Sequence, residues 1–101
     1  MPIYTPPLRD MQFVIHELLN ADKTYAQLPP HQEVDQETIN QILEEAGKFA
    51  SEVVFPLNQI GDREGCKRND DGSVSTPQGF KEAYQQYVDG GWPSLSCDPQ
   101  Y

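Results

Sequence analysis

The chain is an acidic polypeptide of 101 residues with a net charge of −9 and a sequence pI near 4.4. A chain of this size has room for one small domain at most. A nucleic-acid-binding protein needs a basic surface, so this negative charge argues against that class of protein. An anionic membrane surface would also repel the chain. No apolar run approaches the ~20 residues of a membrane span, and the first seven residues lack the features of a signal peptide. We therefore expect a soluble, cytoplasmic protein in which Cys66 and Cys97 are reduced thiols.

The first expected helix runs from about Leu8 to Leu19. Four apolar residues recur in it at helical spacing and predict one apolar stripe: Met11, Val14, Ile15 and Leu18. Leu8 extends this stripe, and Phe13 lies to one side of it. The following residues, 20–34, are mostly polar and contain two consecutive prolines, which predicts a linker or a wrapping segment.

The second expected helix is the longest and begins after Asp35, a favourable N-cap residue. Apolar residues recur at positions i, i+3, i+4 and i+7 for six turns: Ile39, Ile42, Leu43, Ala46, Phe49, Ala50, Val53, Val54, Leu57 and Ile60. Pro56 cannot donate to the carbonyl group of Glu52, so the helix should kink or end there. Because the apolar pattern continues past Pro56, we expect a kink.

A third helix follows an irregular stretch, residues 61–76, in which residues 69–72 predict a tight turn and residues 73–75 a short extended segment. Thr76 as N-cap and Pro77 at the first position predict the start of the helix, and Gly90 and Gly91 predict its end. Its apolar face contains Phe80, Ala83, Tyr84, Tyr87 and Val88. Three apolar faces of this kind predict an all-α fold.

His16 and Glu17 resemble part of the helical zinc-protease motif, which needs a second histidine four residues after the first. That position holds Asn20, and the other histidine, His31, lies beyond the expected helix. We therefore expect no metal site here, and we interpret His16 and Glu17 as ordinary surface residues.

Two loop segments resemble ligand-binding motifs without completing them. Residues 67–78 place Asn69, Asp71 and Gly72 at calcium-loop positions, but Lys67 and Gln78 occupy the first and twelfth positions, where carboxylates belong. We interpret this segment as a turn. Residues 61–65 contain two glycines but lack the spacing and the preceding strand of a dinucleotide-binding loop.

Two groups of residues on the expected helices are also candidates for a catalytic or ligand-binding site. Glu44, Glu45 and Glu52 are interpreted as a solvated polar face of the second helix and not as an acid/base pair. Tyr84, Tyr87 and Trp92 would suit a ligand-binding wall, but at helical spacing they are more often core residues. The sequence therefore offers no catalytic, cofactor-binding or metal-binding residue of its own.

The order of several motifs resembles the acyl-CoA dehydrogenases, in particular the large, mainly bacterial branch that includes the 3-methylmercaptopropionyl-CoA dehydrogenases. The matching segments cover essentially the whole chain: Tyr4-Thr5-Pro6-Pro7-Leu8-Arg9-Asp10-Met11 with Phe13, Glu44-Glu45-Ala46, Lys48-Phe49-Ala50, Pro56-Leu57-Asn58, Gly61-Asp62, Glu64-Gly65-Cys66, Thr76-Pro77, Gly79-Phe80-Lys81-Glu82-Ala83-Tyr84 and Gly90-Gly91-Trp92-Pro93.

This resemblance implies a three-helix fragment of the family's N-terminal helical domain. Residues 1–34 would be an extension with the first helix and a proline-containing linker, and residues 35–101 would begin the domain itself. It also implies a parent enzyme that uses FAD to oxidise an acyl-CoA and passes electrons to electron-transfer flavoprotein. Because the family's catalytic glutamate and flavin contacts lie in later domains, no such residue carries over to this chain.

The role that the resemblance does assign is structural: the second and third helices would line the acyl-chain side of the substrate cavity. Without the rest of the parent chain the exposed apolar faces would lose partners, so we expect self-association, with the long second helices as one means of pairing. The alternative is a helical protein-docking module with no enzymatic parent. The acidic surface and the aromatic face of the third helix support this hypothesis. It does not explain why the motifs occur in the order found in the acyl-CoA dehydrogenases.

Overall fold

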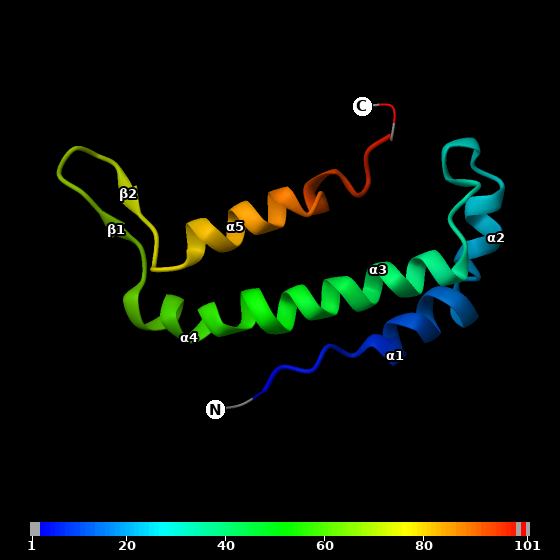
Figure 1. The fold of residues 1–101 in the computed structure, drawn as a ribbon, viewed down its shortest axis with the longest axis horizontal. Helices are drawn as coiled ribbons and strands as arrows, with labels where there is room; N and C mark the ends of the chain where they lie inside the picture. The colour runs from blue at the N-terminus through cyan, green and yellow to red at the C-terminus, as the bar shows by residue number, and fades with distance from the viewer. Residues whose placement is uncertain (1–2, 99, 101) are drawn as a thin grey trace. The chain divides into compact units, whose positions relative to one another are not determined.

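The computed structural model describes residues 3–98 and residue 100. These residues form two compact units, the first up to Ser51 with Asp98 and Gln100, and the second from Glu52 to Cys97. Helices make up most of both units, and the sheet in the described part of the chain is a single two-stranded hairpin (Figure 1). The predicted all-α fold class is therefore confirmed.

The first helix lies where it is predicted, but its covered face differs from the predicted stripe. An α-helix, α1 (Leu8–Gln12), continues directly into a π-helix (Phe13–Leu18). The partly buried residues are Leu8, Gln12, Ile15 and His16, whereas Met11, Val14 and Leu18 are exposed. The wider π turn changes the angular spacing of the side chains, so a stripe deduced from α-helical spacing does not match the face turned towards α3.

The segment expected to be a linker contains a further helix that sequence reasoning missed. Helix α2 (Ala21–Ala26) follows Asn20, which adopts a left-handed conformation with φ of 47°. A 3-10 turn (Pro29–His31) then brings the His31 ring edge-on to the Tyr25 ring, with 5.9 Å between the centroids. Local backbone hydrogen bonds, such as the one from the Lys23 N–H to the Asn20 carbonyl, hold this segment in place.

Helix α3 (Gln36–Phe49) begins at the predicted N-cap, where the Asp35 carboxylate accepts a hydrogen bond of 2.8 Å from the Thr38 N–H. Its residue Ile39 is buried, and Gly47 is buried against the N-terminal segment, where an added Cβ would lie 3.0 Å from the Pro6 ring. The Ser51 hydroxyl also donates to the Tyr4 carbonyl at 3.3 Å. The N-terminal segment is therefore packed along α3.

The second helix continues past Pro56, as predicted. A π-helix (Ala50–Val54) follows α3 and leads without a break into α4 (Phe55–Glu64). Because Pro56 lacks an N–H, the regular α-helical hydrogen-bond ladder is interrupted one turn earlier, and the π turn occupies that position. Apart from Val54, which is exposed, the residues of the predicted apolar stripe are partly or fully buried.

The irregular stretch contains the predicted turn and extended segment, as an antiparallel hairpin of β1 (Lys67–Arg68) and β2 (Val74–Ser75). The Asn69 N–H donates to the Ser73 carbonyl at 2.8 Å and closes the turn.

Helix α5 (Phe80–Asp89) begins later than predicted, so Thr76 is not its N-cap. Gly79 precedes the helix with φ of 91°, a left-handed conformation that only glycine adopts readily, and this residue breaks the expected first turn. The Gln78 N–H instead donates to the Glu64 carboxylate at 2.9 Å. The end at Gly90 is as predicted, and a 3-10 turn (Trp92–Ser94) follows.

Candidate functional site

The start of α5 is held closely against α4. An added Cβ at Gly61 would lie only 2.7 Å from Cζ of Phe80, so the aromatic ring rests on the backbone of α4. An added Cβ at Gly79 would likewise lie 2.8 Å from a methyl carbon of Leu57. Two glycines therefore permit a close approach of the second and third predicted helices within this unit.

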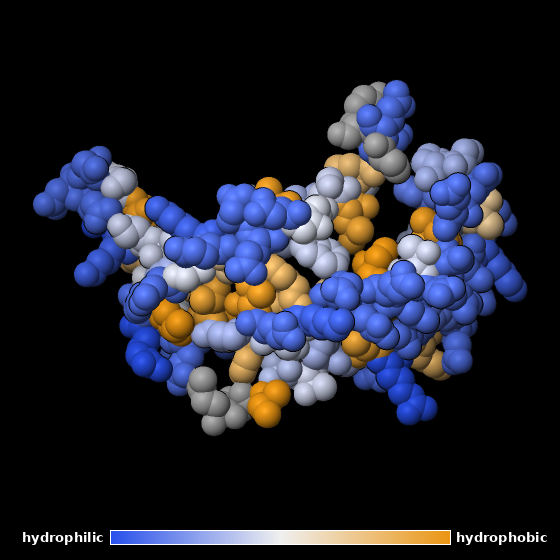
Figure 2. Space-filling view, in the orientation of Figure 1, coloured by the Kyte–Doolittle hydropathy of each residue, from blue (hydrophilic) through white to orange (hydrophobic). Residues whose placement is uncertain are grey.

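Further along α5, the aromatic side chains face outwards instead of forming a core. Tyr84 is 66% exposed, and Tyr87 and Val88 are also exposed. The Tyr84 and Tyr87 rings lie 6.2 Å apart between centroids, and the Trp92 indole beyond them is partly buried close to Gly90. Figure 2 shows apolar residues at the surface among mainly hydrophilic ones. This exposure favours a surface for a ligand or partner over the core interpretation of these residues.

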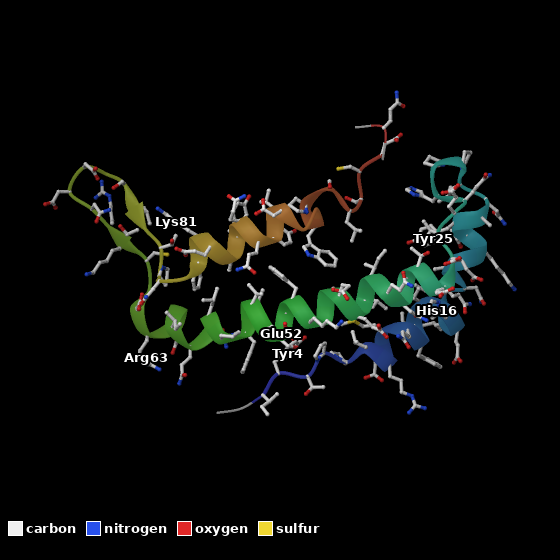
Figure 3. All side chains as sticks on the ribbon, viewed as in Figure 1. Tyr4, His16, Tyr25, Glu52, Arg63 and Lys81 are labelled. Carbon is white, nitrogen blue, oxygen red and sulfur yellow. The ribbon has the colours of Figure 1, made fainter. Side chains whose placement is uncertain are left out.

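His16 faces α3 and is not an ordinary surface residue (Figure 3). Its Nε2 lies 2.7 Å from Oδ1 of Asn40, and because an amide oxygen only accepts, Nε2 is the donor of this hydrogen bond. Nδ1 is buried and has no hydrogen-bond partner among the described residues. The sequence does not indicate this hydrogen bond, because Asn40 lies 24 positions from His16 and no local pattern connects the two residues.

The other parts of the incomplete zinc motif do not join His16. Glu17 is exposed, and His31 contacts the Tyr25 ring. Among residues 3–98 and residue 100, no three histidine, cysteine or acidic side chains are grouped so that they could hold a metal ion.

The acidic groups of the calcium-like segment serve the hairpin turn. The Asp71 carboxylate accepts hydrogen bonds from the Ser73 hydroxyl, at 2.6 Å, and from the Ser73 N–H, at 2.9 Å, and these bonds lower the pKa of Asp71. The Asn69 amide donates to the Ser73 and Ser75 hydroxyls. The interpretation of this segment as a turn is confirmed.

The glycine-containing segment at residues 61–65 does not fit the pyrophosphate of a flavin. Most of it belongs to α4, and Gly61 is occupied by its contact with Phe80. Asp62 and Glu64 add negative charge beside it.

The three glutamates weighed as an acid/base group are all exposed to solvent, as predicted for a polar face. Glu45 pairs with Lys48 at 3.2 Å on the surface of α3, and Glu52 lies in the π-helical segment (Figure 3). None of the helices in the described part of the chain combines the length and the apolar character needed to cross a bilayer.

Comparison with known proteins relates the chain to one enzyme. No protein-family model matches the sequence. Over 93 residues, 92% of its length, the chain is 42% identical to the 3-methylmercaptopropionyl-CoA dehydrogenase of Ruegeria pomeroyi. It spans only 16% of that relative's length. The resemblance to the acyl-CoA dehydrogenases that the order of the motifs indicates is thereby confirmed.

Proposed function

We propose that this chain is the N-terminal part of an FAD-dependent acyl-CoA dehydrogenase of the cytoplasm. The observation that carries the proposal is the 42% identity over 92% of the chain to a 3-methylmercaptopropionyl-CoA dehydrogenase. The parent would remove a proton from the α-carbon and a hydride from the β-carbon of an acyl-CoA thioester. The hydride would reduce the flavin, and the electrons would then pass to electron-transfer flavoprotein.

In this proposal the chain supplies part of the wall of the substrate cavity. The outward-facing side chains of α5, Tyr84, Tyr87 and Val88, support this role because they offer an apolar surface to an alkyl chain. The close packing of Phe80 against Gly61 supports it further, since it fixes α5 on α4 and so positions that surface.

The chain alone would be inactive. A catalytic carboxylate works best in a site from which water is excluded, and Glu44, Glu45 and Glu52 are exposed. With the poor fit of residues 61–65 to a flavin, this leads us to expect a colourless protein that binds no FAD. A tight FAD complex measured by calorimetry would contradict this expectation.

A chimera tests the proposal directly. The segment of the Ruegeria pomeroyi enzyme that matches this chain would be replaced by the chain, and reduction of an electron acceptor by 3-methylmercaptopropionyl-CoA would be measured. We expect the chimera to retain flavin and activity. Within it, Tyr84→Ala should raise KM for the acyl-CoA, whereas Val74→Ala, at an exposed hairpin position, should not. A chimera that holds FAD but fails to oxidise acyl-CoA would refute the proposal.

The alternative function, a helical docking module, is supported by the same exposed side chains on α5. It does not account for the identity to a dehydrogenase. The reading frame of the gene discriminates between the two, because only the dehydrogenase requires several hundred further codons after Tyr101.

A further inference from the structure

The first helix carries an apolar surface that no described residue covers. Four of its large apolar side chains are exposed, Met11, Phe13, Val14 and Leu18, and so is Leu19 directly after it. Phe13 is 55% exposed and Leu18 is 65% exposed, although both belong to a helix whose other face is packed on α3. A concentration of apolar side chains of this kind on a short helix is typical of an interaction surface.

Two opposite charges flank this surface symmetrically. Arg9 lies four residues before Phe13 and Glu17 lies four residues after it, and all three are exposed. Four residues slightly exceed one turn of α1 and fall slightly short of one turn of the π-helix, so the two offsets compensate. Arg9 and Glu17 therefore line up along the helix, with Phe13 between them and about a tenth of a turn to one side. Among the described residues neither Arg9 nor Glu17 has an ion-pair partner.

This order of charges is complementary to itself when two copies run antiparallel. We propose that the exposed face of the first helix binds the same face of a second copy of this chain, with the two-fold axis at Phe13. Arg9 then faces Glu17 of the partner subunit, and Glu17 faces Arg9 of the partner subunit, as an isologous interface requires. A parallel pairing would instead oppose like charges.

The size of the surface makes this a weak dimer. The first helix spans Leu8–Leu18, and two such helices bury less than the roughly 1,200 Å² typical of stable interfaces. The two charge pairs set the register more than the affinity. The net charge of −9 on each copy opposes association, and salt screens this repulsion beyond about 10 Å. We expect a dissociation constant in the micromolar range, independent of whether the parent is a dehydrogenase.

Charge exchange tests both the surface and the register. Sedimentation equilibrium of the 101-residue chain would be measured for Arg9→Glu, Glu17→Arg and the double variant. In the antiparallel dimer, each single variant replaces both pairs of opposite charges by pairs of like charges. Its dissociation constant should therefore rise about tenfold or more. The double variant should restore dimerisation. A mixture of the two single variants should form a heterodimer, because each then supplies the charge that the other needs.

Matched variants distinguish the contribution of this surface to dimerisation from the effects of net charge and of exposed apolar side chains elsewhere. Lys23→Glu and Glu33→Arg make the same changes of charge at other exposed positions and should leave the dissociation constant unchanged. Phe13→Ala should weaken the dimer, whereas Leu95→Ala, at a position 60% exposed in the other unit, should not. Circular dichroism would confirm that each variant keeps the helicity of the unmodified chain.

Three results would overturn the proposal. A monomer throughout the micromolar range would mean that another occupant, such as a further segment of a longer protein, covers this face. A dimer indifferent to Arg9→Glu, Glu17→Arg and Phe13→Ala would place the interface elsewhere. Failure of both the double variant and the mixture to restore association, with helicity intact, would refute the antiparallel register.

Discussion

Replacing Gly61 by alanine sets two opposing effects against each other in α4. Alanine is favoured over glycine in a helix interior by about 1 kcal/mol. The added methyl group would lie 2.7 Å from Cζ of Phe80, well inside the ~3.5–4.0 Å of a favourable carbon contact. Overpacking of this kind costs about 1–3 kcal/mol, so we expect Gly61→Ala to destabilise the protein by up to about 2 kcal/mol.

The Phe80→Leu variant separates the two effects, because leucine does not extend to the position of Cζ. In that background Gly61→Ala should stabilise the protein by about 1 kcal/mol, and the coupling between the two substitutions should be about 1–3 kcal/mol. Urea denaturation followed by circular dichroism measures all four proteins. If Gly61→Ala stabilised both backgrounds equally, the Phe80 ring would not rest on α4 and the reasoning would be wrong.

Three further predictions concern the first unit and the π turn. Val53→Asp should destabilise the protein by about 1–3 kcal/mol, because Val53 is partly buried, whereas exposed Glu52→Ala should change stability by less than about 0.5 kcal/mol; equal melting midpoints would contradict this. Asn40→Ala should cost about 1–2 kcal/mol by leaving Nε2 of His16 unpaired, while exposed Asn58→Ala serves as a control and should cost little; similar losses would argue against the 2.7 Å bond. The Thr38 N–H lowers the pKa of Asp35, so the stability that this carboxylate contributes is present at neutral pH and is lost as the pH falls through the lowered pKa. The difference in helicity between Asp35→Ala and the unmodified chain should therefore shrink on acidification, and a constant difference would refute the assignment.

The sequence by itself predicted those features that depend on nearby residues. Asp35 begins α3 because a carboxylate satisfies free N–H groups within one helical turn. The apolar pattern on both sides of Pro56 correctly predicted that the second helix continues there. Motif order likewise indicated the dehydrogenase relative, because it is a property of the chain and needs no coordinates.

The tertiary structure decided which faces of the helices are covered. The π-helix after Gln12 turned Val14 and Leu18 towards solvent and His16 towards Asn40, 24 positions away. No local pattern specifies a hydrogen bond across that separation or a π turn in place of an α turn. The late start of α5 has the same kind of cause, since the Gln78 N–H is satisfied by Glu64, 14 residues earlier, and Gly79 adopts a left-handed conformation. Covered faces and helix starts of this kind depend on contacts between distant residues, which form only when the chain folds.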